Sequence, residues 1–339
     1  MATGGDTLRY MPPSSLPPIL NRQRHDQLSK HGYLFLPLID PFFKRLQSLS
    51  AAASAFFDQD EDVKRARYPS APDTEVGYYK VKDEKEYVTF RRGVNPDSRL
   101  TAEVGQVWRE AGHLLYRILC ELTQARGLPA SVWSSLAEDA HVLPAADSDL
   151  SIHRTLVRVF RYYTTIGEAA PHVDIGLLTL CVGDGAGLQV LHRTGDKEEW
   201  LDCQGPTILI ADTLRILLNG TVTTGYHRVI GNPNGRSSIV MALRPCLKSP
   251  IDMSSFGGYG LIDSKDFFRE IQASKFNVNA NKDIRDKQQA AFKEKQDQEI
   301  ARLEALSNDQ KHAESSLFSR MSAVLKSKRK STSEQGSPS

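Results

Sequence analysis

The sequence contains no apolar run that approaches the roughly 20 residues a membrane-spanning helix needs. Its first 20 residues are polar and proline-rich, and they lack the basic-then-apolar order of a secretion signal. A strong net charge is also missing, because the formal value is only +2. No global field therefore favours nucleic acid or an anionic membrane. These absences predict a cytoplasmic protein with neither nucleic-acid nor membrane partners.

Cysteine is scarce, with four residues at scattered positions and none in the CxxC spacing of structural zinc sites. We expect reduced thiols and no structural zinc. Hydrophobic residues make up 40% and charged residues 25% of the 339 positions, as in ordinary globular proteins. A chain of this length is sufficient for one large domain or two ordinary ones.

Glycine and proline are absent from residues 261–335, which permits long helices there. We predict that residues 281–339 form a charged helical and disordered tail, available for protein contact, after a C-terminal packing segment at 251–280. Residues 1–20 are predicted to be a loose N-terminal tail.

Helical periodicity is found in the next region, 21–150. Asp40-Pro41 predicts the start of a helix, with Asp40 as N-cap and apolar residues from Phe43 to Phe57 at helical spacing. A second helix is predicted around Val104 to Leu122, ended by Gly127 and Pro129. Residues 31–38 are of strand type, and the charged stretch 58–76 is predicted to be mostly loop.

The pattern changes at about residue 156, where short β-branched and aromatic runs alternate with turn residues. Several short strands at this spacing indicate a sandwich or barrel, so we predict a mostly β core at 151–250 with flanking helices. The candidate strands are 156–163, 177–182, 187–192, 206–211, 227–230 and 237–243.

Two histidines and an aspartate in this core suggest a metal site. Residues two apart on a strand point to the same side, so His172 and Asp174 are expected to share one face. His227 follows 55 positions after His172, far enough for a closed sheet to bring it back. Two imidazoles and one carboxylate hold Fe(II) on one face and leave positions open for substrate and O2.

Arg236 and Ser238 follow His227 closely and would also share a strand face. The planar fork of arginine binds carboxylates bidentately, so the pair suits the far carboxylate of a 2-oxo acid bound beside the metal. Tyr163, on a preceding candidate strand, is a further candidate contact. The alternatives are an ordinary surface ion pair for Arg236 and a buried strand tyrosine for Tyr163.

Over residues 31–247 the chain resembles the isopenicillin N synthase-like branch of the 2-oxoglutarate/Fe(II)-dependent dioxygenases. The resemblance implies a double-stranded β-helix (jelly roll), iron ligands at His172, Asp174 and His227, and 2-oxoglutarate contacts at Arg236, Ser238 and Tyr163. Arg161 and Thr164-Thr165 depart from the family's frequent Asn and Pro-Pro around the tyrosine. The motifs that carry the resemblance, beside these six residues, are HGY at 31–33, Phe56-Phe57, Gly77-Tyr78, Lys85-Glu86-Tyr87, RYY at 161–163, Leu178-Thr179-Leu180, Gly187–Val190, Trp200, Asp212, Asn219-Gly220 and His227–Val229.

The resemblance implies a monomeric enzyme that uses Fe(II), 2-oxoglutarate and O2 to hydroxylate, desaturate or cyclise a small organic molecule. Succinate and CO2 would be released, and specialised metabolism is the expected setting. Two alternatives stay open. One is a 2-oxoglutarate-independent iron oxidase of the same fold, in which Arg236 holds the substrate's own carboxylate. The other is a non-catalytic binding or interaction protein.

Overall fold

The computed structural model describes residues 17–38, 40–71, 74–137, 140–163 and 168–273, with Lys275, Asn279 and scattered positions between 286 and 298. Residues 1–279 form one compact unit and residues 280–339 a second, whose described positions are helical. Most of the predicted tails, 1–20 and 281–339, lie outside the described residues. Within the described part, no helix has the length and apolarity needed to cross a membrane.

Helices and strands both contribute to the first unit. The α-helices are α1 Arg22–His31, α2 Asp40–Phe57, α3 Glu61–Arg67, α4 Arg99–Gln124, α5 Ser134–Ala137, α6 Asp212–Leu217 and α7 Ser264–Ala273, with 3-10 turns η1 Ala130–Trp133 and η2 Met253–Phe256. The strands are β1 Tyr33–Phe35, β2 Gly77–Val81, β3 Lys85–Phe90, β4 Leu156–Tyr162, β5 Ala169–His172, β6 Leu178–Gly183, β7 Leu188–Thr194, β8 Lys197–Asp202, β9 Thr207–Ile210, β10 His227–Val229, β11 Arg236–Leu243, β12 Ile251–Asp252 and β13 Leu261–Ile262.

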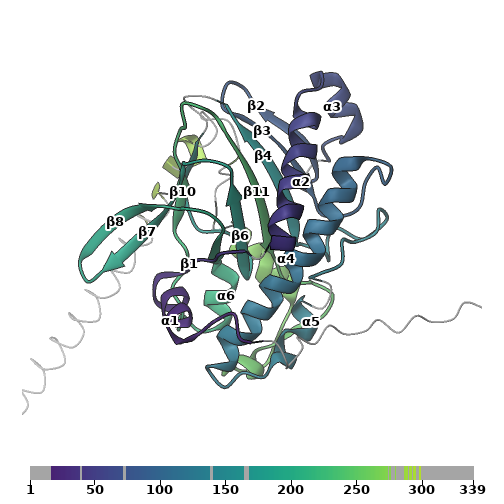
Figure 1. Cartoon of the computed structure of the whole chain (residues 1–339). Coiled ribbons are helices and arrows are strands. Elements are labelled where there is room, and N and C mark those ends of the chain that lie inside the picture. The colour runs from purple at the N-terminus through teal and green to yellow at the C-terminus, as the bar shows by residue number, and fades with distance from the viewer. Residues whose placement is uncertain are drawn as a thin grey trace, which may run out of the picture. The chain divides into compact units, whose positions relative to one another are not determined.

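Two antiparallel sheets make the β core (Figure 1). The major sheet has the order β1-β9-β6-β11-β4-β3-β2, and the minor sheet has the order β5-β10-β7-β8. Between the sheets lies a small cluster rich in aromatic side chains, which includes Tyr87, Phe160 and Tyr162. The predicted mostly β core with flanking helices is confirmed, and the arrangement is that of a jelly roll.

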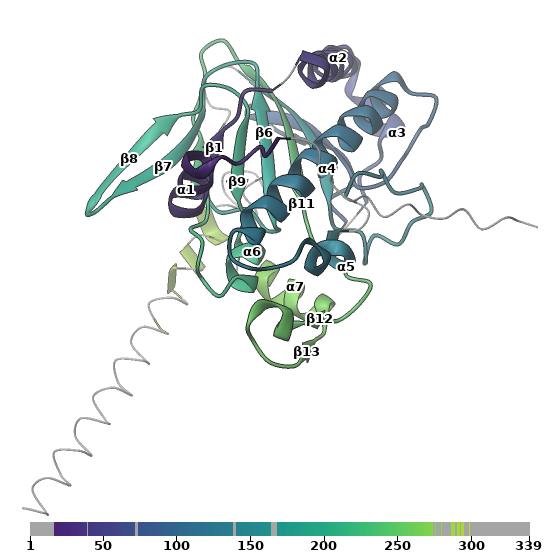
Figure 2. The ribbon, with the colours of Figure 1, turned by 60° about the horizontal axis from the view of Figure 1, so that its bottom comes forward.

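The larger hydrophobic core lies between the major sheet and the helices α2 and α4. Figure 2 shows α4 running across the strands of this sheet. Its apolar residues recur every three or four positions, so one face of the helix is buried, with Val104, Ala111 and Leu115 fully inaccessible. Burial of one such leucine contributes about 1.5–3 kcal/mol, which makes α4 a rigid support for the sheet.

Local structure differs from the sequence prediction at the helices α1 to α3. The prediction missed α1, a polar helix whose start is capped by the Asn21 side chain and whose end is the left-handed Gly32. Asp40 is the first helical residue of α2 and so is not its N-cap. The stretch 58–76, predicted to be mostly loop, contains α3. That helix is anchored through the buried Lys64, a charged contact that leaves no apolar periodicity to detect.

Candidate functional site

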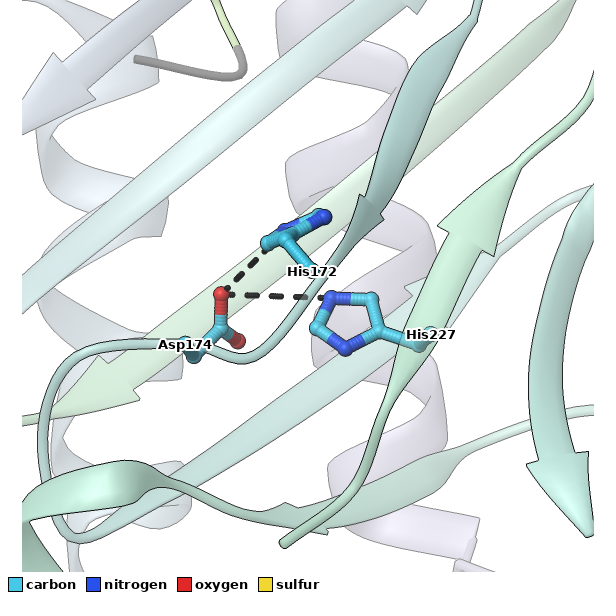
Figure 3. Close-up of side chains that lie close together, drawn as sticks. All are labelled: His172, Asp174 and His227. Atoms are coloured by element: carbon cyan, nitrogen blue, oxygen red, sulfur yellow. Dashed lines mark ion pairs between the residues drawn. The ribbon is translucent and has the colours of Figure 1, made fainter. Parts of the chain in front are cut away.

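The three predicted metal ligands lie together in the structure (Figure 3). His172 and His227 direct Nε2 toward the same Asp174 oxygen, at 3.5 and 3.9 Å from Oδ1. The two imidazole rings have centroids 4.2 Å apart. One ligand atom from each residue falls within 4.8 Å of the others. In the described ranges no other group of three or more His, Cys, Asp or Glu side chains has this metal-type arrangement.

Strand pairing places the two histidines. His227 on β10 lies directly opposite His172 on β5 in the antiparallel register of the minor sheet. The prediction that a later strand would return to the first pair is confirmed, but the return is to the neighbouring position in one sheet. Adjacent antiparallel strands fix such side chains about 5 Å apart, which suits two ligands of one ion.

Asp174 is held in another way, because β5 ends at His172 and the aspartate lies in the following loop. The expectation that strand alternation would position it is therefore wrong. Its carbonyl oxygen accepts a hydrogen bond of 3.0 Å from the Asp212 amide at the start of α6. Gly176, with φ of 133°, lets this loop pass β11 closely, because a Cβ there would lie 2.7 Å from the Leu243 carbonyl oxygen.

The outer nitrogens of both histidines are already engaged. Nδ1 of His172 donates to the Ala170 carbonyl at 2.7 Å, and Nδ1 of His227 donates to the Gly225 carbonyl at 2.9 Å. A neutral imidazole that donates from Nδ1 carries its lone pair on Nε2. Both Nε2 atoms are thus available as metal ligands, with ring orientations fixed by backbone contacts.

The pKa shifts of Asp174 and His227 favour an ionised carboxylate and a neutral imidazole. Burial would raise the pKa of Asp174, but His227 and His172 hold it well below its usual range. Burial, together with His172, lowers the pKa of His227 to about 4, although Asp174 acts in the opposite direction. At neutral pH the carboxylate is ionised and His227 is neutral, as metal binding requires. The donor set fits Fe(II), with one face ligated and the remaining positions open.

A cavity between the two sheets is lined by these three residues and by both members of the predicted acid anchor. Arg236 and Ser238 share one face of β11 and are 6% and 4% exposed. The remaining lining is mostly apolar and comes from β4, β6, β11 and the minor sheet, with Asn279 beyond them. The lining residues are Arg158, Phe160, Tyr162, Ala169, His172, Asp174, Cys181, Leu188, His227, Val229, Arg236, Ser238, Val240 and Asn279.

Space for the Arg236 guanidinium depends on Gly183 at the end of β6. A Cβ at this glycine would lie 2.3 Å from Nη2 and 2.7 Å from Nε of Arg236. The Nε atom donates to the Gly185 carbonyl at 3.2 Å, and the guanidinium carbon lies 5.7 Å from the centre of the Tyr162 ring. The role of Gly183 left no local signal in the sequence, because the requirement comes from a residue on another strand.

Tyr163, the predicted further contact, is not among the residues that line this cavity. Tyr162 lines the cavity beside Arg236, whereas Tyr163 follows the end of β4 and hydrogen-bonds Glu86. Side chains alternate faces along β4, and Tyr162 is on the face that lines the site. The same alternation brings Arg158 into the cavity, two positions before Phe160 and four before Tyr162. Its parity with Tyr162 on β4 was the signal that could have revealed it.

Comparison with known proteins agrees with the geometry. Residues 154–245, which include all three metal-type residues, match the model of the 2OG-Fe(II) oxygenase superfamily. No curated protein matches by sequence.

Solved structures share the fold. The full-length T7H of Neurospora crassa, crystallised with alpha-KG and 5-formyluracil, is 18% identical, with a TM-score of 0.57 over 75% of this chain and 89% of its own. A 2OG-Fe(II) oxygenase family protein from Caulobacter crescentus is 19% identical (TM-score 0.59; 74% and 92% covered). The dioxygenase for auxin oxidation in rice is 18% identical (TM-score 0.56; 77% and 92% covered).

The matched residues carry the part of the chain on which the chemistry depends. They span β4 to β11 and so supply the two histidines, the aspartate and the Arg236-x-Ser238 pair. Residues 154–245 of this chain therefore match the 2OG-Fe(II) oxygenase superfamily, and the His-Asp-His group within them fits the Fe(II) that this family uses.

Proposed function

We propose that the enzyme is a dioxygenase that oxidises a small organic molecule, with iron at His172, Asp174 and His227 and 2-oxoglutarate at Arg236 and Ser238. The observation that carries the proposal is that both groups open into one cavity. Two neutral imidazoles and one carboxylate give iron a +1 site, and the Arg236 guanidinium in the same cavity complements the second carboxylate of 2-oxoglutarate.

Each residue has a distinct part in this proposal. The backbone-held imidazoles and Asp174 fix the metal position. Arg236 binds the distal carboxylate bidentately, Ser238 adds a hydroxyl donor, and the Tyr162 ring restricts the guanidinium from the side. Bound Fe(II) and 2-oxoglutarate supply oxygen activation, with release of succinate and CO2.

The cavity wall supports a water-poor reaction site. Phe160, Leu188 and Val229 are buried and lie among the lining residues. Exclusion of water protects reactive species from side reactions and strengthens the fixed polar contacts.

Hydroxylation, desaturation and ring closure are all compatible with this site. The Neurospora structure contains a modified pyrimidine and the rice enzyme is named for auxin oxidation, so proteins of this fold act on small molecules. We extend that class to the present chain and propose a specialised metabolite as substrate.

The proposal is tested by anaerobic titration of the metal-free protein with Fe(II) and 2-oxoglutarate. We expect a metal-to-ligand charge-transfer absorption band in the visible range and succinate release once air is admitted. His172→Ala and Asp174→Ala should each remove the band, because two ligands are too few to hold the ion.

His192→Ala serves as the matched control, since His192 lies on β7 and outside the metal cluster, with Nδ1 hydrogen-bonded to the Tyr33 hydroxyl. The control should keep the band. An absent band in the wild-type protein, together with no succinate, would refute the proposal. A band without succinate coupled to turnover would identify a 2-oxoglutarate-independent oxidase.

A further inference from the structure

Four arginines surround a single glutamate where the cavity meets the β3, β4 and β11 strand ends. Arg158 lines the cavity, and Arg91, Arg154 and Arg244 lie around it. Glu75 pairs with two of them, through Arg244 Nη1 at 2.6 Å and Arg158 Nη2 at 3.1 Å. Among the described residues, this is the one carboxylate paired with the cluster. Positive charge is therefore in excess beside the cavity.

The excess leaves buried polar atoms without partners. The Nε atoms of Arg91, Arg154 and Arg244 are buried and donate to no partner in the described part of the chain. Burial, then Arg154 and Arg244, lower the pKa of Arg91 to about 9 even though Glu75 acts against the shift. Such a field attracts an anion, and buried charges of one sign are retained when a ligand compensates them.

Arg158 is the member that a ligand in the cavity can reach. Its Nε donates to Thr89 Oγ1 at 2.7 Å and its Nη2 pairs with Glu75, so the guanidinium is fixed in orientation. The side chain is only 11% exposed, and its guanidinium carbon lies 5.2 Å from the centre of the Tyr87 ring. A rigid, half-satisfied arginine is pre-organised for a further acceptor.

The two cavity arginines come from different positions along the same pair of strands. In the β4–β11 register Arg236 is opposite Tyr162, whereas Arg158 is opposite Val240. Four residues of strand separate these positions, which is roughly 13 Å at 3.3 Å per residue. The two guanidinium groups thus come from separate backbone positions and lie beside different rings, Tyr162 for Arg236 and Phe160 for Arg158, so each can hold a carboxylate of its own.

Between Arg158 and Arg236 the cavity wall is aromatic. Phe160 lies 5.3 Å from Tyr162 and 5.3 Å from Tyr87, which stacks on Tyr79 at 5.2 Å. Arg158 lies 5.8 Å from the Phe160 ring. An apolar ligand body therefore finds aromatic contact beside the cationic group.

We infer that the substrate is an organic acid, whose carboxylate pairs with Arg158 while its apolar body lies along Phe160 toward the metal residues. This inference rests on the proposed function for the direction of the substrate, but the carboxylate site itself stands without metal. The flat fork of arginine favours a carboxylate, which it binds through two parallel hydrogen bonds.

Binding of matched acids and amides tests the inference. The probes are phenylacetate, 3-phenylpropionate and octanoate, each compared with its primary amide by isothermal titration calorimetry. Two preparations of the full chain are used, one metal-free and one loaded with Mn(II) and 2-oxoglutarate, which do not turn over. We expect at least one acid to bind both preparations about tenfold or more tightly than its amide, since charged hydrogen bonds contribute at this level.

Substitutions assign the effect to the cluster. Arg158→Gln should remove the preference for acid over amide, while Glu75→Gln should keep or increase it because the positive excess grows. Arg193→Gln is the charge-matched control, since this arginine is exposed on β7 and pairs with Glu198. Arg236→Gln should weaken 2-oxoglutarate binding and leave acid binding intact.

Four outcomes would overturn the inference. They are equal binding of acids and amides, no binding of any acid, an unchanged preference in Arg158→Gln, and loss of acid binding when 2-oxoglutarate is present. The last outcome would place the acids at Arg236. Failure of Mn(II) and 2-oxoglutarate to bind would instead count against the proposed function, while the metal-free titration would still decide the carboxylate site.

Discussion

At the residue scale, the absence of a side chain at Gly183 makes room for the Arg236 guanidinium. The Arg236 guanidinium occupies the volume that a Cβ would take, at 2.3 Å from Nη2. We predict that Gly183→Ala displaces the guanidinium and raises the Kd for 2-oxoglutarate about tenfold or more, because a charged hydrogen-bonded pair is weakened. Calorimetry in the presence of Mn(II) measures the change.

Gly185→Ala is the control for this prediction, since a Cβ there would meet only the Asn232 side chain at 3.3 Å. Metal affinity should stay unchanged in both variants because neither glycine contacts the triad. An unaltered Kd in Gly183→Ala would contradict the steric account.

The types of the candidate ligand residues were predictable from the sequence, but the structural elements that position them were not. Residue chemistry and spacing identified the three metal-type residues and the Arg236-Ser238 pair. Strand alternation then predicted the face of Asp174 for a strand that ends two residues earlier, and it chose Tyr163 where Tyr162 faces the cavity. Odd and even positions indicate opposite faces of a strand only where the strand bounds are known. An error of one residue assigns a side chain to the wrong face. The roles of all six residues stay proposals.

At the element scale, the buried Glu86 on β3 joins three neighbouring elements. It accepts hydrogen bonds from Lys64 of α3 at 2.7 Å, from the Tyr78 hydroxyl of β2 at 2.6 Å and from Arg161 of β4 at 2.8 Å. These contacts explain why α3 forms without an apolar stripe, and why neither α3 nor β3 was predicted from the sequence. Long-range ion pairs leave no local periodicity.

Replacement of Glu86 should therefore destabilise the fold. We predict that Glu86→Gln lowers the free energy of unfolding by about 3 kcal/mol, because it leaves buried cations without their partner. Urea unfolding followed by circular dichroism measures this, with the exposed Glu198→Gln as control. Equal stability of the two variants would contradict the structural role.

At low pH, the difference in free energy of unfolding between the wild-type protein and Glu86→Gln should disappear. Burial would raise the pKa of Glu86, but Lys64, Tyr78 and Arg161 lower it below its ordinary value. A carboxylate with a depressed folded pKa stabilises the fold above its unfolded pKa of about 4.3, and the contribution is lost as pH falls through the folded value. The gap between the two proteins should be full at neutral pH and shrink in acid.

At the scale of the whole molecule, the metal site joins parts of both sheets. His172 and His227 belong to the minor sheet, whereas the Asp174 loop is tied to α6 and passes β11 of the major sheet. We predict that Mn(II) with 2-oxoglutarate stabilises the chain by about 2.7 kcal/mol at 100 times their Kd. In a thermal-shift assay, adding Mn(II) and 2-oxoglutarate should raise the Tm of the wild-type protein and leave the Tm of Asp174→Ala unchanged. A shift retained in that variant would place the metal elsewhere.

The overall architecture was predictable to a useful degree. Six candidate strands between 156 and 243 correspond to β4, β6, β7, β9, β10 and β11, and the second predicted helix is α4. Strands β2, β3, β5 and β8 were not predicted. These strands are short, rich in polar residues or held by buried charges, so they lack alternating apolar side chains. The domain boundaries, the monomeric state and the cytoplasmic location stay predictions.

The direct pairing of His172 with His227 has a consequence for tolerance to insertions. Inter-strand hydrogen bonds between β5 and β10 set the ligand spacing, so the length of the connecting chain does not enter it. The β7–β8 hairpin lies within that connection and ends in an exposed turn at Gly195-Asp196. Extra residues inserted at this turn can extend the protein outward, as a graft or reporter, without stretching the distance between the two imidazoles.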